Sequence, residues 1–245
     1  MQWVLFFMLV NSLMHPSPEE HIQKIDMMLE GEEMAIIFLP LSDGEATLFK
    51  HASGKTVLLN TGAPHTEREL KRWFEQFHIT EIDELILTSD DREYTGNVDW
   101  IMKTYEPTVV DDWKENKTYE PFPHFRMIPL HTAHGDVTMS LQYGRLRLLY
   151  MAHADDDVEQ KLMKLSLSDV NILKIAHFGL VDYPRTSFLK HVDPQVAIIF
   201  KKHGSWPNER LLERLYAAWI DCYETSRFGV IVVKCNLKEY DVMTF

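Results

Sequence analysis

The sequence predicts an α/β protein built as a four-layer αββα sandwich, with helices outside two stacked sheets. In the first half, short apolar runs separated by turn residues predict strands at 34–41, 46–50 and 56–60, ahead of the first long helix. The second half repeats this order of antiparallel strands followed by alternating strands and helices. Two sheets that stack face to face, with helices on their outer faces, would bury the apolar residues of both halves.

In the first half, Thr66 and Glu69 have the spacing of a capping box, which predicts a helix start. The apolar face of that helix carries Leu70, Trp73 and Phe74. Further along, residues 82–88 and 107–111 are predicted strands and residues 97–103 a helix. We expect a loop at 115–123, which is polar, aromatic and interrupted by prolines.

In the second half, residues 137–142 and 146–151 are predicted to form a hairpin. Helices are expected near Val158, at 186–191 and from Pro207, with strands at 170–175 and 195–200 between them. A last hairpin is expected from 220–224 and 230–235. Cys222 and Cys235 would then lie close together, and we expect them to form a disulfide if the protein is exported.

Composition limits the classes of function. The 245 residues are 45% apolar, enough for one sizeable core, and carry a formal net charge of −12. This acidity argues against an extended nucleic-acid interface, which needs a basic stripe. Neither a partner nor an oligomeric state follows from the composition.

The first residues form a separate segment. Residues 3–10 are continuously apolar, too short to span a bilayer and suited to the core of a secretory signal. We therefore treat 1–16 as an apolar signal-like segment, 17–33 as an amphipathic helix leading in, and 34–245 as one domain. A buried strand or helix is the alternative for the first segment, so export or membrane association and a cytoplasmic location both remain open.

Chemistry is expected at the loops that follow strands, where α/β proteins collect their functional groups. These loops contain a set of polar and aromatic candidates: Asn60, Ser89, Asp91, Glu93, Tyr94, His153, His177 and Phe178.

Several of these segments together resemble the metallo-β-lactamase superfamily, and most closely the C-terminal domain of the DNA-uptake protein ComEC and its free-standing relatives. Residues 53–62 (SGKTVLLNTG) are similar to the family's S-G-K-T-x-L-I-D-T-G, and residues 41–46 (LSDGEA) to its V-G-Q-G-D-A turn. Residues 172–179 (ILKIAHFG) resemble V-L-K-x-P-H-H-G. The resemblance covers nearly the whole chain from Met34 and implies the same sandwich fold.

This chain departs from the family at the metal-binding positions. The signature H-x-H-x-D-H loop corresponds here to Ser89, Asp91, Glu93 and Tyr94, without a histidine. The aspartates of the D-T-G and G-D-A elements are replaced by Asn60 and Glu45, and the later G-D pair falls near residues 152–153. In place of the second histidine of H-H-G stands Phe178, and in place of the histidine of a late G-H-P element stands Trp206.

Two functions follow from these departures. In the first, the protein has no metal cofactor and is a non-catalytic binding or regulatory protein, with Asn60, Ser89, Tyr94, Phe178 and Trp206 lining a vestigial pocket. In the second, Asp91, Glu93, His153 and His177 bind zinc or manganese in a remodelled site that hydrolyses a phosphodiester or another ester.

Two other groups have simpler interpretations. His131 and His134 are interpreted as solvated histidines of a loop, since Gly135 and Asp136 indicate a turn. The run of aspartates that begins at Asp155 is typical of a helix start.

Overall fold

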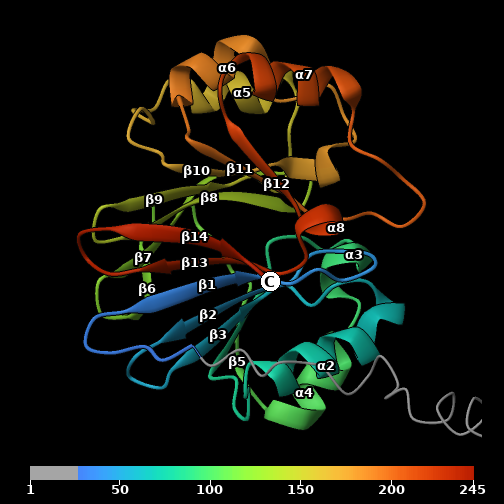
Figure 1. Ribbon diagram of the computed structural model, residues 1–245, viewed down its shortest axis with the longest axis vertical. Coiled ribbons are helices and arrows are strands. Elements are labelled where there is room, and N and C mark those ends of the chain that lie inside the picture. Colours follow the sequence, from blue (N-terminus) through green and yellow to red (C-terminus); the bar gives the residue numbers. More distant parts are fainter. Residues whose placement is uncertain (1–26) are drawn as a thin grey trace, which may run out of the picture.

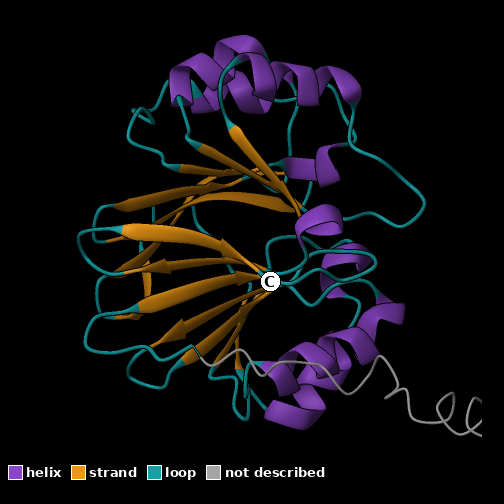
Figure 2. Ribbon diagram, in the orientation of Figure 1, coloured by secondary structure: helices purple, strands orange, loops and turns teal. Residues whose placement is uncertain are grey.

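The structure, a computed structural model, describes residues 27–245 and consists of two seven-stranded sheets stacked face to face (Figure 1). The strand orders are β14-β13-β1-β2-β3-β4-β5 and β12-β11-β10-β9-β8-β7-β6. Helices cover the outer face of each sheet (Figure 2), so the predicted four-layer αββα sandwich is confirmed. The predicted segment 1–16 and residues 17–26 of the predicted lead-in helix lie outside the described residues.

The strands of the first sheet are β1 (Met34–Phe38), β2 (Thr47–His51), β3 (Thr56–Leu59), β4 (Glu84–Ile86), β5 (Thr108–Val110), β13 (Ile231–Cys235) and β14 (Tyr240–Thr244). Those of the second are β6 (Tyr119–Phe122), β7 (Phe125–Ala133), β8 (Asp136–Tyr143), β9 (Leu146–Tyr150), β10 (Ile172–Lys174), β11 (Val196–Ile199) and β12 (Asp221–Glu224). The helices are α2 (Glu67–Gln76), α3 (Arg92–Thr95), α4 (Val98–Tyr105), α5 (Asp156–Leu162), α6 (Thr186–Val192), α7 (Glu209–Ala217) and α8 (Thr225–Phe228), with the short 3-10 turns η2 (Pro64–Thr66) and η3 (Ala176–Gly179).

Apolar residues are buried on both faces of the sheets. In β1, Ile36 and Phe38 contribute to the core between the sheets, whereas Ala35 and Ile37 face the helix layer, as the two-residue period of a strand requires. Across the central layer, the rings of Phe49 from one sheet and Phe125 from the other lie 5.1 Å apart. The sandwich is therefore stabilised by three apolar layers, one central and two beneath the helices.

The predicted hairpin at the end of the chain is wrong. Strand β12 pairs in parallel with β11 in the second sheet, whereas β13 pairs with β1 and with β14, a strand that we did not predict. Helix α8 and the residues around it carry the chain from one sheet to the other. Cys222 and Cys235 therefore lie in different sheets and are free thiols, so the expected proximity is also wrong.

The segment before the β8–β9 hairpin is more ordered than predicted. The expected loop at 115–123 contains β6, and the long strand β7 follows it. His131 is not solvated, because it lies in β7 with only 8% of its surface exposed and contacts Glu115 at 2.9 Å. His134 is exposed in the β7–β8 turn, as expected.

The predicted capping box at the start of α2 does not form. The Thr66 hydroxyl donates to the carbonyl of Ala63, and the Glu69 carboxylate accepts hydrogen bonds from the backbone and side chain of Ser42. A tertiary contact thus replaces the local one that the spacing predicts.

The topology brings the functional loops together. Strands β3 and β4 are parallel, as are β9, β10 and β11, so the carboxyl ends of each set lie at a common edge. No helix within residues 27–245 has the length and apolar character needed to span a bilayer.

Candidate functional site

A cluster of histidines and carboxylates, centred on His153, lies where these strands end. His153 follows β9, and its Nδ1 lies 3.1 Å from Oδ2 of Asp136 at the start of β8. Its Nε2 lies 3.4 Å from Oδ2 of Asp155. The rings of His134 and His177 flank it, with centroids 5.0 and 4.6 Å away. Three separate loops therefore contribute to one polar cluster.

His177 is held by an unusual backbone. It and Phe178 have φ values of 50° and 57°, and Gly179 continues in the left-handed region at 68°. Two successive non-glycine residues in this region cost about 1–2 kcal/mol each. The Ala154 N–H donates to Nε2 of His177 at 3.3 Å, so this nitrogen is an acceptor. Burial, followed by the neighbouring His153, lowers the pKa of His177, which favours the neutral ring.

Asp91 faces the same cluster from the loop after β4. Its backbone N–H donates to Oγ of Ser89 at 3.1 Å. Burial is the largest cause that raises the pKa of Asp91, followed by the negative charge of Asp136, while His153 opposes the shift. Asp91, His153 and His177 of the predicted set are therefore in one electrostatic neighbourhood.

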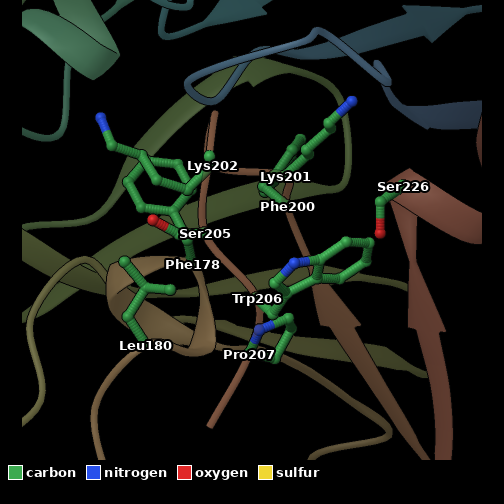
Figure 3. Close-up of a pocket in the computed structure, with 10 residues that line it drawn as sticks. Phe178, Leu180, Phe200, Lys201, Lys202, Ser205, Trp206, Pro207 and Ser226 are labelled. Carbon is green, nitrogen blue, oxygen red and sulfur yellow. The ribbon is translucent and has the colours of Figure 1, made fainter.

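Glu93, the fourth member of that set, is paired elsewhere. Its Oε1 lies 2.5 Å from Nζ of Lys202, which also lies 3.3 Å from Oδ1 of Asp43. The hydrogen bond from Lys202 lowers the pKa of Glu93. In Figure 3 the Lys202 side chain crosses the ring of Phe178, and its ammonium is 5.5 Å from the ring centroid. An ammonium group therefore neutralises the carboxylate that aligns with a metal ligand.

An aromatic layer lies beneath the polar cluster. Tyr94 is 3% exposed, and its ring centroid is 5.8 Å from that of Phe178. These are the positions at which the resembling family has two histidines. A buried phenol and a phenyl ring now contact each other there, and burial raises the pKa of Tyr94 well above its ordinary value.

A buried ion pair supports this layer. Nζ of Lys174 on β10 contacts Oε2 of Glu45, and both side chains are fully buried. Lys174 also donates to the carbonyl of Met151 at 3.0 Å, and the Tyr150 hydroxyl donates to Glu45 at 3.0 Å. Burial raises the pKa of Glu45 and lowers that of Lys174, while the charge of each partner opposes the shift.

Asn60 and Ser89, which were predicted to line the pocket, are buried beneath the surface. Asn60 is fully buried, and its amide exchanges hydrogen bonds with the side chain and backbone of Thr88, which ties the end of β3 to β4. Ser89 is 4% exposed. The sequence pattern identified both residues, but their contacts are those of a scaffold.

An open pocket of about 260 Å³ lies beside Lys202 (Figure 3). Phe178 and Trp206 both line it, as do Leu180 and Lys201. Trp206 is 80% exposed, and the Lys201 side chain points away from that of Lys202. The pocket therefore combines apolar rings with two lysines, of which Lys202 is paired with Glu93 and Asp43.

Four residues of this region were not among the predicted ligands: His134, Asp136, Asp155 and Lys202. Asp155 caps α5, as its sequence position predicted. The Gly135 turn signal located His134 and Asp136 in the chain, but nothing local indicated that the turn meets the loop after β9. Lys202 lies between Lys201 and His203 in the sequence, and nothing there indicates a pairing with Glu93.

No family model and no curated protein matches this sequence. Among solved structures, the metallo-β-lactamase fold protein YhfI from Bacillus subtilis is similar over 86% of this chain and 100% of its own, with a TM-score of 0.60 and 10% identity. The chain has the metallo-β-lactamase fold. Igni18, a metallo hydrolase from the archaeon Ignicoccus hospitalis, matches over 86% of this chain and 99% of its own, with a TM-score of 0.58 and 10% identity. A diphosphatase of the PhnP family matches over 78% and 94%, with a TM-score of 0.52 and 13% identity.

The side chains at the motif positions do not fit the zinc centre that the resembling family has. Zinc favours imidazole and thiolate ligands, whereas these positions hold a serine hydroxyl, a buried phenol and a phenyl ring. The carboxylate of Glu93 is already paired with Lys202. Of the imidazoles in this region, that of His177 lies within the segment 172–179, that of His153 lies where the later G-D pair falls, and that of His134 comes from the β7–β8 turn.

Proposed function

We propose that this protein is a ComEC-like relative of the zinc hydrolases that no longer hydrolyses and serves as a binding or regulatory protein. The observation that carries this proposal is the ion pair between Lys202 and Glu93, above the contact of Tyr94 with Phe178. Hydrolysis in a metal site depends on an ion that polarises the substrate and activates a water. At the motif positions, an ammonium and two aromatic rings supply neither.

The binding site that this function needs is the pocket beside Lys202. Its aromatic walls at Phe178 and Trp206 suit apolar or planar groups. Since Lys202 is paired with Glu93 and Asp43, Lys201 is the lysine of its lining that would attract negative charge. The protein's net charge of −12 makes this local positive charge more selective for small anions than for a long polyanion.

A second candidate function is metal-dependent hydrolysis in a displaced site. It is favoured by the contact between the rings of His153 and His177 and by the charge interaction of Asp91 with His153. Two of the similar structures, a metallo hydrolase and a diphosphatase, also favour it. In this function Asp91 would position a water or a metal-bound substrate.

The two functions are separated by turnover of a generic phosphodiester, bis(p-nitrophenyl) phosphate, in the presence of zinc or manganese. We expect the native protein to give no more product than the matched variants Asp91→Ala and His153→Ala. Metal-dependent turnover that falls at least about tenfold in both variants would overturn the proposal and establish the second function.

A further inference from the structure

His153 and two neighbouring side chains are arranged for a cation away from Glu93, Tyr94 and Phe178. Among residues 27–245, His134, His153 and Asp155 are the one set of such side chains whose ligand atoms all lie within 4.8 Å of one another. His134 comes from the β7–β8 turn, and the other two come from the segment between β9 and α5. His134 lies outside the motif segments named above, and Asp155 lies two residues after the position where the later G-D pair falls.

The helix cap of α5 orients Asp155. Its Oδ1 accepts a hydrogen bond from the Val158 N–H at 2.8 Å, the bond of an N-cap. This bond directs the other oxygen, Oδ2, to within 3.4 Å of Nε2 of His153. One carboxylate oxygen is therefore committed to the backbone, and the second faces the imidazole.

The hydrogen bonding of His153 indicates what lies between its Nε2 and Oδ2 of Asp155. Asp136 is 7% exposed and, as a carboxylate, can only accept, so the proton of a neutral His153 belongs on Nδ1, 3.1 Å from Oδ2 of Asp136. Nε2 then presents a lone pair to the carboxylate oxygen of Asp155. Two acceptors at 3.4 Å repel each other unless a cation lies between them. A ring nitrogen bonded to a carboxylate, with the other free for a metal, is the usual arrangement of a histidine ligand.

We propose that His134, His153 and Asp155 bind one divalent transition-metal ion of the zinc class, with Asp136 as the residue that positions His153. Two imidazoles and a carboxylate form a ligand set suited to zinc, and three protein ligands leave a fourth position for water or an anion. Donor atoms around tetrahedral zinc lie about 3.3 Å apart. The ligand atoms of His134, His153 and Asp155 lie within 4.8 Å of one another, so they need to approach only slightly to bind zinc. His134 is exposed in its turn and can make this movement without moving a strand.

This ion would link the β7–β8 turn to the start of α5. The site is separate from the Glu93–Lys202 pair, so its occupation does not depend on whether the protein hydrolyses anything. The competing arrangement is a doubly protonated His153 held between Asp136 and Asp155, in which no metal binds.

The test is titration of the full-length, chelator-treated protein with Zn²⁺ by calorimetry, and with Co²⁺ by visible absorption. We expect one ion per chain at micromolar affinity or tighter, and Co²⁺ bands typical of low coordination number. His134→Ala and Asp155→Asn should each weaken Zn²⁺ binding by at least about tenfold. Asparagine retains the N-cap of α5, so this variant removes the charged ligand without removing the cap.

His65→Ala is the matched control, because His65 is an exposed histidine beside Asp43. It should bind zinc as the native protein does. Asp136→Asn should weaken binding by about 10–100-fold if Asp136 positions His153. The proposal is overturned if the native protein binds no zinc, or if His134→Ala and Asp155→Asn bind it as tightly as His65→Ala does. Turnover is measured separately, so a failure of this proposal does not affect the proposed function.

Discussion

Replacing Lys174 by methionine tests the buried ion pair beneath the site. Methionine has a similar length and no charge, so the change removes the ammonium while largely filling its volume. Glu45 would retain the hydroxyl of Tyr150 as a donor, but its Oε1 already has no hydrogen-bond partner among the described residues. The variant therefore leaves a carboxylate in a fully buried position without a counter-charge.

Removal of one partner from a buried pair costs about 3–5 kcal/mol of unfolding free energy. For a domain with a stability of about 5–15 kcal/mol, this loss is readily measured by urea denaturation followed by tryptophan fluorescence. The loss should shrink at lower pH. Burial raises the pKa of Glu45 above its unfolded value, so the folded variant binds a proton more readily than the unfolded chain and gains stability as the pH falls.

The double variant Glu45→Gln with Lys174→Met separates charge from packing. It removes both charges and keeps an oxygen that accepts from Tyr150, so most of the lost stability should return. A cost below about 1 kcal/mol for Lys174→Met, or a double variant as unstable as the single one, would refute the argument. The second result would mean that the lysine stem, rather than its charge, is what stabilises the fold.

Three further predictions concern the rest of the sandwich. Burial raises the pKa of Cys222 and of Cys235 to about 12. Neither thiol should therefore react with a chromogenic disulfide reagent at about pH 8 in the folded protein, and both should react after unfolding. A thiol that reacts in the folded protein would contradict this. Burial also raises the pKa of Glu159, so its contribution to stability declines as the pH rises above the ordinary range of a glutamate. The free energy of unfolding of Glu159→Gln should therefore increase relative to that of the native protein as the pH rises from about 4 to about 7. A difference in unfolding free energy that does not change with pH would contradict this prediction. Gly144→Ala should cost about 2–4 kcal/mol in urea denaturation, because the new Cβ would lie 2.3 Å from the backbone of residue 237 and φ is 53°. In Gly54→Ala, where φ is 91° and no atom lies within 4 Å, only the backbone strain remains, so an equal loss in both variants would be inconsistent with the clash.

The sandwich was predictable because its signals are local. The continuous apolar run of β1 and the apolar face of α2 are visible in the sequence, and both are buried in the structure. The errors occurred where strand pairing is decided over long distances. The residues of β12 and β13 fit a hairpin locally, but β13 pairs edge to edge with β1, near the start of the domain. Nothing within ten residues of Cys235 specifies that partner.

The site was predictable as a place, but not as a set of contacts. The predicted ends of the strands identified the loops that carry Asp91, His153 and His177, and these loops lie close together. The pairing of Glu93 with Lys202 could not be predicted, because it joins residues 109 positions apart through two loops. Spacing predicts which residues reach the edge of a sheet, whereas side-chain direction decides which of them meet.

Under the proposed function, the contacts at the motif positions have a simple electrostatic explanation. A metal centre concentrates carboxylates because the ion neutralises them, so loss of the ion leaves negative charges that must be paired, protonated or removed. Here Lys202 pairs with Glu93 and Asp43, and aromatic rings occupy two motif positions. Within residues 27–245, neither Asp136 nor Asp155 forms an ion pair with a lysine or an arginine. This contrast is why a cation is expected beside His153 and not beside Glu93.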